Sequence, residues 1–285
     1  MNTTAGCTIS TALIEAAKRL HSTGDAPHLE AQILLSHAMS KPRAWLLAHG
    51  RETLDADCAK HFDHLLEERL CGLPIAYLIG SREFWSRNFH VAPAVLIPRP
   101  ETEHLIEAAL EIFGDDGAHR IADLGTGSGI IAITLGLERP CSHILATDIS
   151  ADALAIAQGN AQRLGASNVE FRHTDWLSGF GNESFDLIIS NPPYIAEDDR
   201  HLHEGDVRFE PRHALVAEEN GLCALRTIIM QARQHLRVGG WLMLEHGYDQ
   251  AAAITNLLRE YGYCAIESRA DFAGHMRLTM GRQDS

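Results

Sequence analysis

The sequence lacks the features that mark disulfide-linked, secreted and membrane-spanning proteins. Its six cysteines are scattered and form no C-x-x-C pair, so we expect reduced thiols rather than a disulfide framework. No stretch approaches the roughly 20 apolar residues that a membrane-spanning helix needs. The first residues show no cationic segment followed by an apolar run, so we expect no signal peptide. These absences predict a soluble, cytoplasmic protein.

Positive charge is scarce and unevenly distributed. The chain has 24 Lys and Arg against 38 Asp and Glu, a formal net charge of −14. Lysine is confined to residues 1–75, and the 17 cations beyond residue 75 are all arginines. An acidic chain disfavours tight, non-specific binding to nucleic acid. We therefore expect no stable nucleic-acid binding and no association with membranes.

Histidine is abundant, but its spacing does not predict a metal site. His61 and His64 are spaced for one face of a helix, and His201 and His203 lie in a predicted loop. Neither pair has a third ligand at a recognisable distance, and zinc needs at least three protein ligands. We predict no bound metal.

The length of 285 residues and the changes of pattern along the chain predict two domains joined by a linker. Apolar residues recur at helical spacing through residues 1–75, which predicts a small helical bundle. Aromatic and branched residues among turn formers predict a β-hairpin linker over residues 76–100. Over residues 101–285, strands alternate with helices, which predicts an α/β fold around a mostly parallel sheet.

A glycine-rich loop, Ile121–Gly129, connects a predicted strand to a predicted helix. Its glycines at 125, 127 and 129 let the backbone turn sharply and let a ligand approach main-chain N–H groups. The G-x-G-x-G spacing is tighter than the dinucleotide pattern G-x-G-x-x-G and lacks the Lys-Ser/Thr of a P-loop. By itself the loop is also compatible with a merely tight strand-to-helix turn.

Asp148 stands at the end of the next predicted strand, 19 residues after Gly129. An acid at this place can accept hydrogen bonds from a ribose diol. Its alternative interpretation is a turn residue ahead of a helix that Ser150 would cap. Together, the glycines and Asp148 predict a nucleoside-like cofactor, and the form Asp-x-Gly-x-Gly-x-Gly favours S-adenosylmethionine over NAD.

The tetrapeptide Asn191-Pro-Pro-Tyr194 directly follows the apolar strand Phe185–Ser190. Two consecutive prolines restrict the backbone and remove two N–H donors, which leaves carbonyl groups free to accept from a ligand. Asn191 adds a side-chain carbonyl, and Tyr194 adds an aromatic face for a planar group. A simple proline-rich turn is the alternative interpretation.

This arrangement suits a planar –NH2 group conjugated to a carbonyl or a ring. Such a nitrogen is a poor nucleophile because its lone pair is delocalised. Two acceptors that bind its two hydrogens, the side chain of Asn191 and the carbonyl of Pro192, would orient it for attack on a methyl carbon. The sequence does not identify the final proton acceptor.

The combined pattern resembles class I S-adenosylmethionine-dependent methyltransferases that act on amide or exocyclic amino nitrogens. It more closely resembles the peptide chain release factor N(5)-glutamine methyltransferase family (PrmC/HemK), over nearly the whole chain. The motifs that carry this resemblance are Gly80, Glu83-Phe84, Leu96–Glu103, Asp123–Gly129, Asp148, Trp176, Asn191–Tyr194, Phe209-Glu-Pro211, Ala214-Leu215, Glu245-His-Gly247, Asp271, Gly274 and Arg277. The tail departs slightly from the family pattern, because His275-Met276 precede Arg277 where a more polar pair is expected.

The resemblance implies a Rossmann-like sheet with an antiparallel terminal strand and S-adenosylmethionine as the cofactor. The cofactor-binding residues it implies are Gly125, Thr126, Gly127, Ser128, Gly129, Asp148 for the ribose, Trp176 beside the adenine, and Asn191. It also implies that Asn191, Pro192, Pro193 and Tyr194 hold the substrate glutamine, and that Asn191, Pro192 and Tyr194 are catalytic. The implied substrate is the glutamine of the Gly-Gly-Gln motif in class I release factors, with residues 1–75 as the recognition domain.

Several alternatives remain open at this point. Within the class, the substrate could be a glutamine of a large-subunit ribosomal protein, although Arg99-Pro-Glu101 looks more like the release-factor branch. A nucleic-acid base is a second alternative, because a related D/N-P-P-Y/F motif occurs in enzymes that methylate base amino groups. A non-catalytic cofactor-binding scaffold is a third. The segment Arg99–Thr102 either shapes the cofactor pocket or, with Glu103, caps the following helix.

Overall fold

The computed structural model describes residues 6–21, 26–114 and 117–284. The chain divides into two compact units. The first comprises Met1–Ser81 with His201–Phe209, and the second comprises Arg82–Arg200 with Glu210–Ser285. Within the described residues, no helix is both long enough and apolar enough to cross a membrane.

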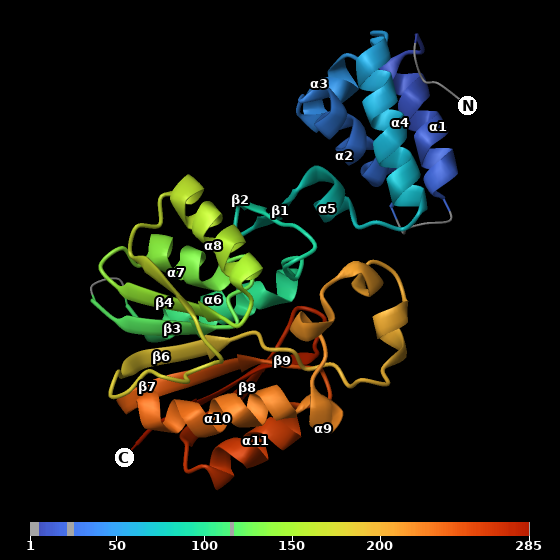
Figure 1. The fold of residues 1–285 in the computed structure, drawn as a ribbon. Helices are drawn as coiled ribbons and strands as arrows, with labels where there is room; N and C mark the ends of the chain where they lie inside the picture. Colours follow the sequence, from blue (N-terminus) through green and yellow to red (C-terminus); the bar gives the residue numbers. More distant parts are fainter. Residues whose placement is uncertain (1–5, 22–25, 115–116, 285) are drawn as a thin grey trace. The chain divides into compact units, whose positions relative to one another are not determined.

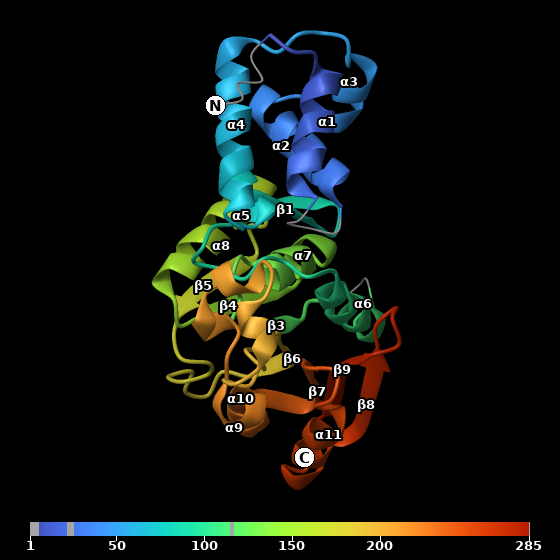
Figure 2. The same ribbon diagram turned by 90° about the vertical axis from the view of Figure 1, so that its right-hand side faces the viewer.

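The first unit is a helical bundle. Its helices are α1 (Ile9–Leu20), α2 (Pro27–Met39), α3 (Arg43–Ala48), α4 (Ala56–Leu70) and α5 (Ile75–Ile79). Thr8 and Asp55 cap the first turns of α1 and α4, because their side-chain oxygens accept from backbone N–H groups there. Helices α1, α2 and α4 lie side by side (Figures 1 and 2) and bury Leu20, Leu34 and Phe62 between them.

A buried arginine connects this bundle to the segment 201–209, which contains most of η2 (Arg200–His203) and all of η3 (Val207–Phe209). Two nitrogens of Arg69 donate to the carboxylate of Glu30, both at 2.9 Å. A third interaction of Arg69 is a 2.7 Å bond from Nη1 to Asp206. The long segment after Ser190 therefore contributes its middle part to the helical unit.

The second unit contains a seven-stranded sheet in the order β5-β4-β3-β6-β7-β9-β8. Its strands are β3 (Arg120–Leu124), β4 (His143–Asp148), β5 (Val169–His173), β6 (Phe185–Ser190), β7 (Leu236–Glu245), β8 (Cys264–Ala270) and β9 (Met276–Arg282). Strands β3 to β7 run parallel, whereas β9 is antiparallel to both of its neighbours. The predicted fold class is confirmed. A separate hairpin pairs β1 (Ser81–Phe84) with β2 (Arg87–His90).

Helices cover both faces of the sheet (Figure 1). Those on one face are α6 (Glu103–Ile112), α7 (Ile130–Glu138) and α8 (Ala151–Leu164), and those on the other are α10 (Cys223–His235) and α11 (Ala251–Glu260). The predicted cap of α8 is confirmed, because Ser150 Oγ accepts from the N–H of Ala153 at 3.2 Å. The remaining short turns are η1 (Pro100–Thr102), η4 (Arg212–Ala214) and α9 (Glu218–Gly221).

The strand order places a crevice at one edge of the sheet. From β3 the chain moves outward to β4 and β5, then returns to β6 on the other side of β3. Ligands of open parallel sheets bind outside the carboxyl ends of the strands at such a reversal. The glycine loop follows β3, Asp148 ends β4 and Asn191 follows β6, so all three predicted motifs reach this edge.

Candidate active site

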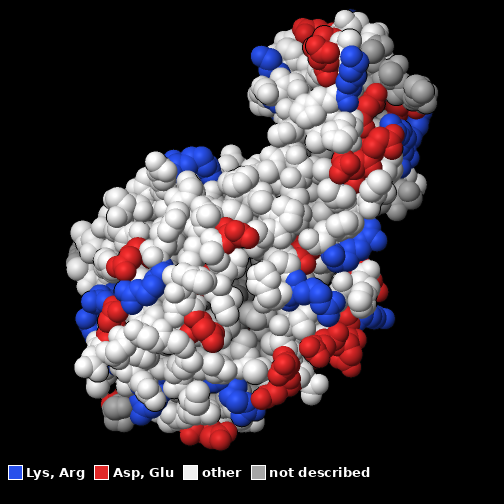
Figure 3. Space-filling model, in the orientation of Figure 1, with Lys and Arg blue, Asp and Glu red and all other residues white. Residues whose placement is uncertain are grey.

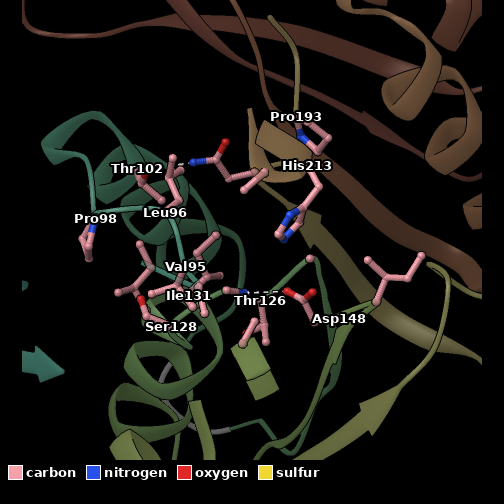
Figure 4. A pocket seen from close by; sticks show the side chains of 18 of the residues that line it. Val95, Leu96, Pro98, Thr102, Thr126, Ser128, Ile131, Asp148, Pro193 and His213 are labelled. Carbon is pink, nitrogen blue, oxygen red and sulfur yellow. Dashed lines mark hydrogen bonds between the residues drawn. The ribbon is translucent and has the colours of Figure 1, made fainter. Parts of the chain in front are cut away.

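A cavity of ≈340 Å³ lies at this edge of the sheet, within the second unit. Of the predicted site residues, those that line it are Gly125, Thr126, Gly127, Ser128, Asp148, Trp176, Asn191 and Pro193. Figure 4 shows Thr102 and Pro193 on one side of the cavity, with Thr126, Ser128 and Asp148 on the opposite side. Gly129, Pro192 and Tyr194 belong to the same loops but are not among the residues that line the cavity.

All three glycines of the loop have backbone conformations that other residues rarely adopt, with φ +86° at Gly129. Gly125 has φ +70° and Gly127 has φ +57°. A Cβ added to Gly125 would lie 3.3 Å from the ring of Trp176, and one added to Gly127 would meet no atom within 4 Å. The backbone of Gly127 therefore faces open space in the cavity, where a ligand can approach it closely.

Asp148 is fixed by backbone donors on both sides of its carboxylate. Oδ2 accepts from the N–H of Gly127 at 2.9 Å, and Oδ1 accepts from the N–H of Ser150 at 2.8 Å. Each carboxylate oxygen has a second lone pair. Asp148 can therefore be held rigidly by the loop and still accept hydrogen bonds from hydroxyl groups of a ligand.

Asp123, at the base of the glycine loop, is a fully buried carboxyl group. Its Oδ2 accepts from the hydroxyl of Thr126 at 2.6 Å and from the N–H of Ala132 at 3.1 Å. Burial raises the pKa of Asp123 to about 7. These bonds tie the start of α7 to the end of β3, which holds the loop in shape.

Apolar side chains complete this end of the cavity. Val95, Ile131 and Trp176 line it together with the polar groups of the loop. A few convergent polar groups in a largely apolar cavity are typical of small-molecule sites. Exposed backbone at Gly127, a carboxylate suited to a diol and an apolar wall that contains an indole ring fit a nucleoside-like cofactor.

The Asn191 side chain is part of a buried hydrogen-bonded network. Its Nδ2 donates to Thr102 Oγ1 at 3.1 Å, and the Thr102 hydroxyl donates to Glu245 Oε2 at 2.7 Å. Tyr194 OH donates to the other oxygen of Glu245 at 3.4 Å. Burial raises the pKa of Glu245 to about 7, and burial followed by the charge of Glu245 raises the pKa of Tyr194.

The sheet register brings Glu245 beside the Asn191 loop. Ser190 of β6 pairs with Leu244 of β7 in a parallel register, so the residues that follow them, Asn191 and Glu245, are neighbours at the same edge. Gln250 supports the same loop, because its Nε2 donates to the carbonyl of Tyr194 at 3.0 Å. Side chains at the end of β7 and just after it therefore support the Asn191 loop.

The structure of the segment Arg99–Glu103 does not agree with the capping interpretation. Thr102 occupies the N-cap position of α6, but its side chain makes no capping bond and is directed at Glu245 instead. Arg99 lines the cavity and pairs with the buried Glu210 at 2.5 Å. Glu103 accepts from the backbone N–H of Trp85 at 2.9 Å. The segment thus contributes Arg99 and Thr102 to the cavity wall.

Several residues of the site received no role from the sequence, although Leu96 and Glu245 belong to motifs that carry the family resemblance. Val95, Leu96 and His213 line the cavity, and Glu245 lies behind Asn191. The position of Glu245 at the end of an apolar strand was the available signal, since an acid there is buried at the sheet edge that carries the other motifs. Nothing in the local sequence around Val95 or His213 indicates that they reach the cavity.

Comparison with known proteins places the chain in a family. Residues 11–80 match the PrmC N-terminal domain, and residues 103–206 match the methyltransferase small domain. A release factor glutamine methyltransferase of Xylella fastidiosa (strain Temecula1) is 49% identical over 254 residues, which cover 89% of this chain and 92% of the relative. One from Vibrio cholerae is 45% identical over 278 residues, 96% of each chain.

The fold has counterparts among solved structures. A methyltransferase from Pyrococcus furiosus aligns with a TM-score of 0.55 at 18% identity, covering 78% of this chain and all of that one. At this identity the likeness extends to the fold alone. The two relatives above share almost half of their residues with this chain over nearly their full length. The chain therefore belongs to the release factor glutamine methyltransferase family.

Proposed function

We propose that this protein transfers a methyl group from S-adenosylmethionine to the side-chain amide nitrogen of the glutamine in the Gly-Gly-Gln motif of class I release factors. The observation that carries this proposal is the position of the Asn191 amide, which lines the same cavity as the glycine loop. Family membership supports the substrate, because the relatives bear the name of this reaction.

The cofactor end of the cavity is formed by the glycine loop and Asp148. The residues that we assign to S-adenosylmethionine are Gly125, Thr126, Gly127, Ser128, Gly129, Asp148, Trp176 and Asn191. When bound, the cofactor supplies an electrophilic methyl group on a cationic sulfur. Asp148 would accept from the ribose hydroxyls, and the exposed backbone at Gly127 leaves room for the cofactor chain.

The substrate end is formed by the Asn191-Pro-Pro-Tyr194 loop. Asn191 Oδ1 and the carbonyl of Pro192 would accept the two hydrogens of the glutamine –NH2 group, which directs the nitrogen lone pair at the methyl carbon. Formation of the N–C bond would be balanced by loss of the methyl group from the cofactor's sulfur, which would keep the bonding electron pair. One amide hydrogen then leaves as a proton. The loop acts by orienting the amide and stabilising the positive charge that develops on it.

The surface charge disfavours a nucleic acid as the main substrate. On the face in Figure 3, arginine and lysine side chains are interspersed with aspartate and glutamate. Arg120 pairs with Glu183, and Arg172 pairs with both Glu183 and Glu170, so two carboxylates neutralise two cations that would otherwise be available to phosphates. Binding to nucleic acid depends on unneutralised cations that displace counterions from phosphates.

The decisive test is incubation with labelled S-adenosylmethionine and a purified class I release factor, either wild type or with the glutamine of its Gly-Gly-Gln motif substituted. We expect label in the wild-type factor only, and mass spectrometry should locate one methyl group on the glutamine side chain. Label in the substituted factor, or preferential label in a large-subunit ribosomal protein offered in the same reaction, would contradict the proposal.

Residues 1–75 are proposed to recognise the protein substrate. Deleting them should raise the KM for the release factor much more than the Kd for the cofactor, because the cavity is built entirely from the second unit. Titration calorimetry would measure the Kd of S-adenosylmethionine, and initial rates would give the KM. If the deletion leaves both constants unchanged, the recognition role is wrong.

A further inference from the structure

Three polar groups form a chain that runs from the interior of the second unit to the cavity wall. Glu245 is 1% exposed and is not among the residues that line the cavity, whereas Thr102, itself buried, and Asn191 both line it. Thr102 Oγ1 lies between the other two groups, bonded to Asn191 Nδ2 and to Glu245 Oε2. Because it has a single proton, it can donate to only one of them.

The charge of Glu245 fixes the direction of this chain. An ionised carboxylate only accepts, so it takes the proton of the Thr102 hydroxyl. Thr102 Oγ1 then offers only lone pairs to Asn191, and only the NH2 end of the amide can donate to them. The nitrogen and oxygen of the Asn191 amide lie on opposite sides of the bond between Cβ and Cγ. When Nδ2 faces Thr102, Oδ1 is therefore turned away from it.

Protonation of Glu245 would allow the opposite direction. The protonated carboxyl can donate to Thr102, and the Thr102 hydroxyl can then donate to Asn191. The Asn191 amide would rotate by half a turn so that its oxygen accepts this bond. Its NH2 end would then face a substrate –NH2 group, and two donors facing each other form no hydrogen bond.

We propose that Glu245 is a positioning residue for methyl transfer, because its carboxylate acts through the Thr102 hydroxyl to keep the oxygen of the Asn191 amide facing the substrate. This inference rests on the proposed function, since it requires a substrate that presents an –NH2 group. Glu245 touches neither the substrate nor the cofactor in this account. It acts on the orientation of the group that does.

The surroundings of Glu245 cause its carboxyl group to gain and lose a proton near neutral pH. Its pKa is raised to about 7, mainly by burial and to a smaller extent by the charge of Glu101 on η1. The hydrogen bond from Thr102 acts in the opposite direction. Arg277 on β9 and the hydroxyl of Tyr194 lower it. The ionised form, which holds Asn191 in the accepting orientation, therefore becomes dominant as the pH rises through about 7.

Substitutions of Thr102 test the relay. Thr102→Val removes the hydroxyl at nearly constant volume and should lower kcat for release-factor methylation about 10- to 100-fold, the value of one charge-linked hydrogen bond. The Kd for S-adenosylmethionine should stay within about threefold. Thr102→Ser restores the hydroxyl and should recover most of the loss. Thr134→Val is the matched control, because Thr134 is a buried threonine on α7, outside the cavity lining.

The pH profile of Glu245→Gln is the second test. Glutamine offers both a donor and an acceptor to Thr102, so it cannot fix the direction of the chain. We expect kcat of the wild type to fall as the pH drops below about 7. The variant should have a lower kcat that does not change over the same range. If Thr102→Val fails to fold, the pH profile of Glu245→Gln is sufficient to test the inference.

The outcomes separate this inference from the proposed function. A wild-type protein that transfers no methyl group to the release factor would overturn both. If the wild type is active, a Thr102→Val variant with wild-type kcat would overturn the inference alone. So would a Glu245→Gln variant that follows the wild-type pH profile, because a merely structural carboxyl group would not determine that profile.

Discussion

The two ends of the cavity are built in different ways. At the cofactor end, defined by residues 125–129 and Asp148, a backbone N–H of one loop and one carboxylate bind each other directly. At the amide end, defined by Thr102, Asn191 and Glu245, three side chains come from segments 89 and 143 residues apart. The first end is encoded in a short motif, whereas the second exists only once the sheet has formed.

A buried carboxyl group supports each end: Asp123, which bonds to the glycine loop, and Glu245, which bonds to Thr102. Burial raises the pKa of Asp123 and that of Glu245 to about 7. The donors to Asp123, Thr126 and Ala132, lie within nine residues of it in the chain. Those to Glu245 come from other segments of the unit. Substitutions at the two ends should therefore separate cofactor binding from turnover.

The largest effect is expected for Asn191→Ala. Loss of the acceptor that orients the substrate amide should lower kcat by at least about 100- to 1000-fold, the range for removal of one group that stabilises a transition state. The Kd for S-adenosylmethionine, measured by calorimetry, should change much less than kcat, because the glycine loop, Asp148 and Trp176 are unchanged. Equal losses in turnover and cofactor affinity would instead indicate that Asn191 is structural.

The converse effect is expected for Asp148→Ala. The variant loses the bond from the N–H of Gly127 and the bonds to the ribose that we propose, so the Kd for S-adenosylmethionine should rise about 10- to 100-fold. At saturating cofactor, kcat should remain close to that of the wild type. Asp152→Ala is the matched control, since Asp152 is an exposed acid in the first turn of α8. A fall in kcat without a change in the Kd for S-adenosylmethionine would contradict the assignment of Asp148 to cofactor binding.

A smaller effect is expected in the stability of Glu245→Gln. Because the folded-state pKa of Glu245 is raised to about 7, its contribution to stability is present below pH 4.5 and is lost as the pH rises through about 7. Glutamine does not titrate, so the stability of the variant relative to the wild type should increase over this window by roughly 1–3 kcal/mol. Urea unfolding at pH 5 and pH 8 measures the difference.

Asp123 is present in both proteins, and its titration therefore cancels from this comparison. If the relative stability of the variant does not change between the two pH values, Glu245 is not the buried ionised group that the account requires. If the relative stability changes as expected and the kcat of Glu245→Gln is lower than that of the wild type, the carboxylate of Glu245 both lowers stability and supports turnover. A functional site that is maintained at a cost in stability is a common trade-off.

Much of the fold could be predicted from the sequence. Strands β3, β4 and β6 are short apolar runs because both faces of a parallel sheet are buried. The limits of these apolar runs and the turn residues that flank them place the glycine loop, Asp148 and Asn191 at strand ends. Helix α8 begins where the sequence predicts, because Ser150 caps its start, and Gly165 in a left-handed conformation ends it.

The amide end could be predicted only in part. The residues Asn191-Pro-Pro-Tyr194 are recognisable, but the partner of Asn191 depends on which strand lies beside β6 and in which register. Thr102 has the local signature of a helix cap, and tertiary structure directs its hydroxyl to Glu245 instead. Local propensity cannot reveal such a contact, because its partner lies 143 residues away.

The most direct test of the central claim is a crystal structure with S-adenosylhomocysteine and a glutamine-containing release-factor fragment. We expect Asn191 Oδ1 and the carbonyl oxygen of Pro192 both to lie about 3 Å from the glutamine amide nitrogen. That nitrogen should in turn face the sulfur. A structure in which Asn191 presents Nδ2, or in which both oxygens face away from the sulfur with no space for a glutamine side chain, would contradict the account.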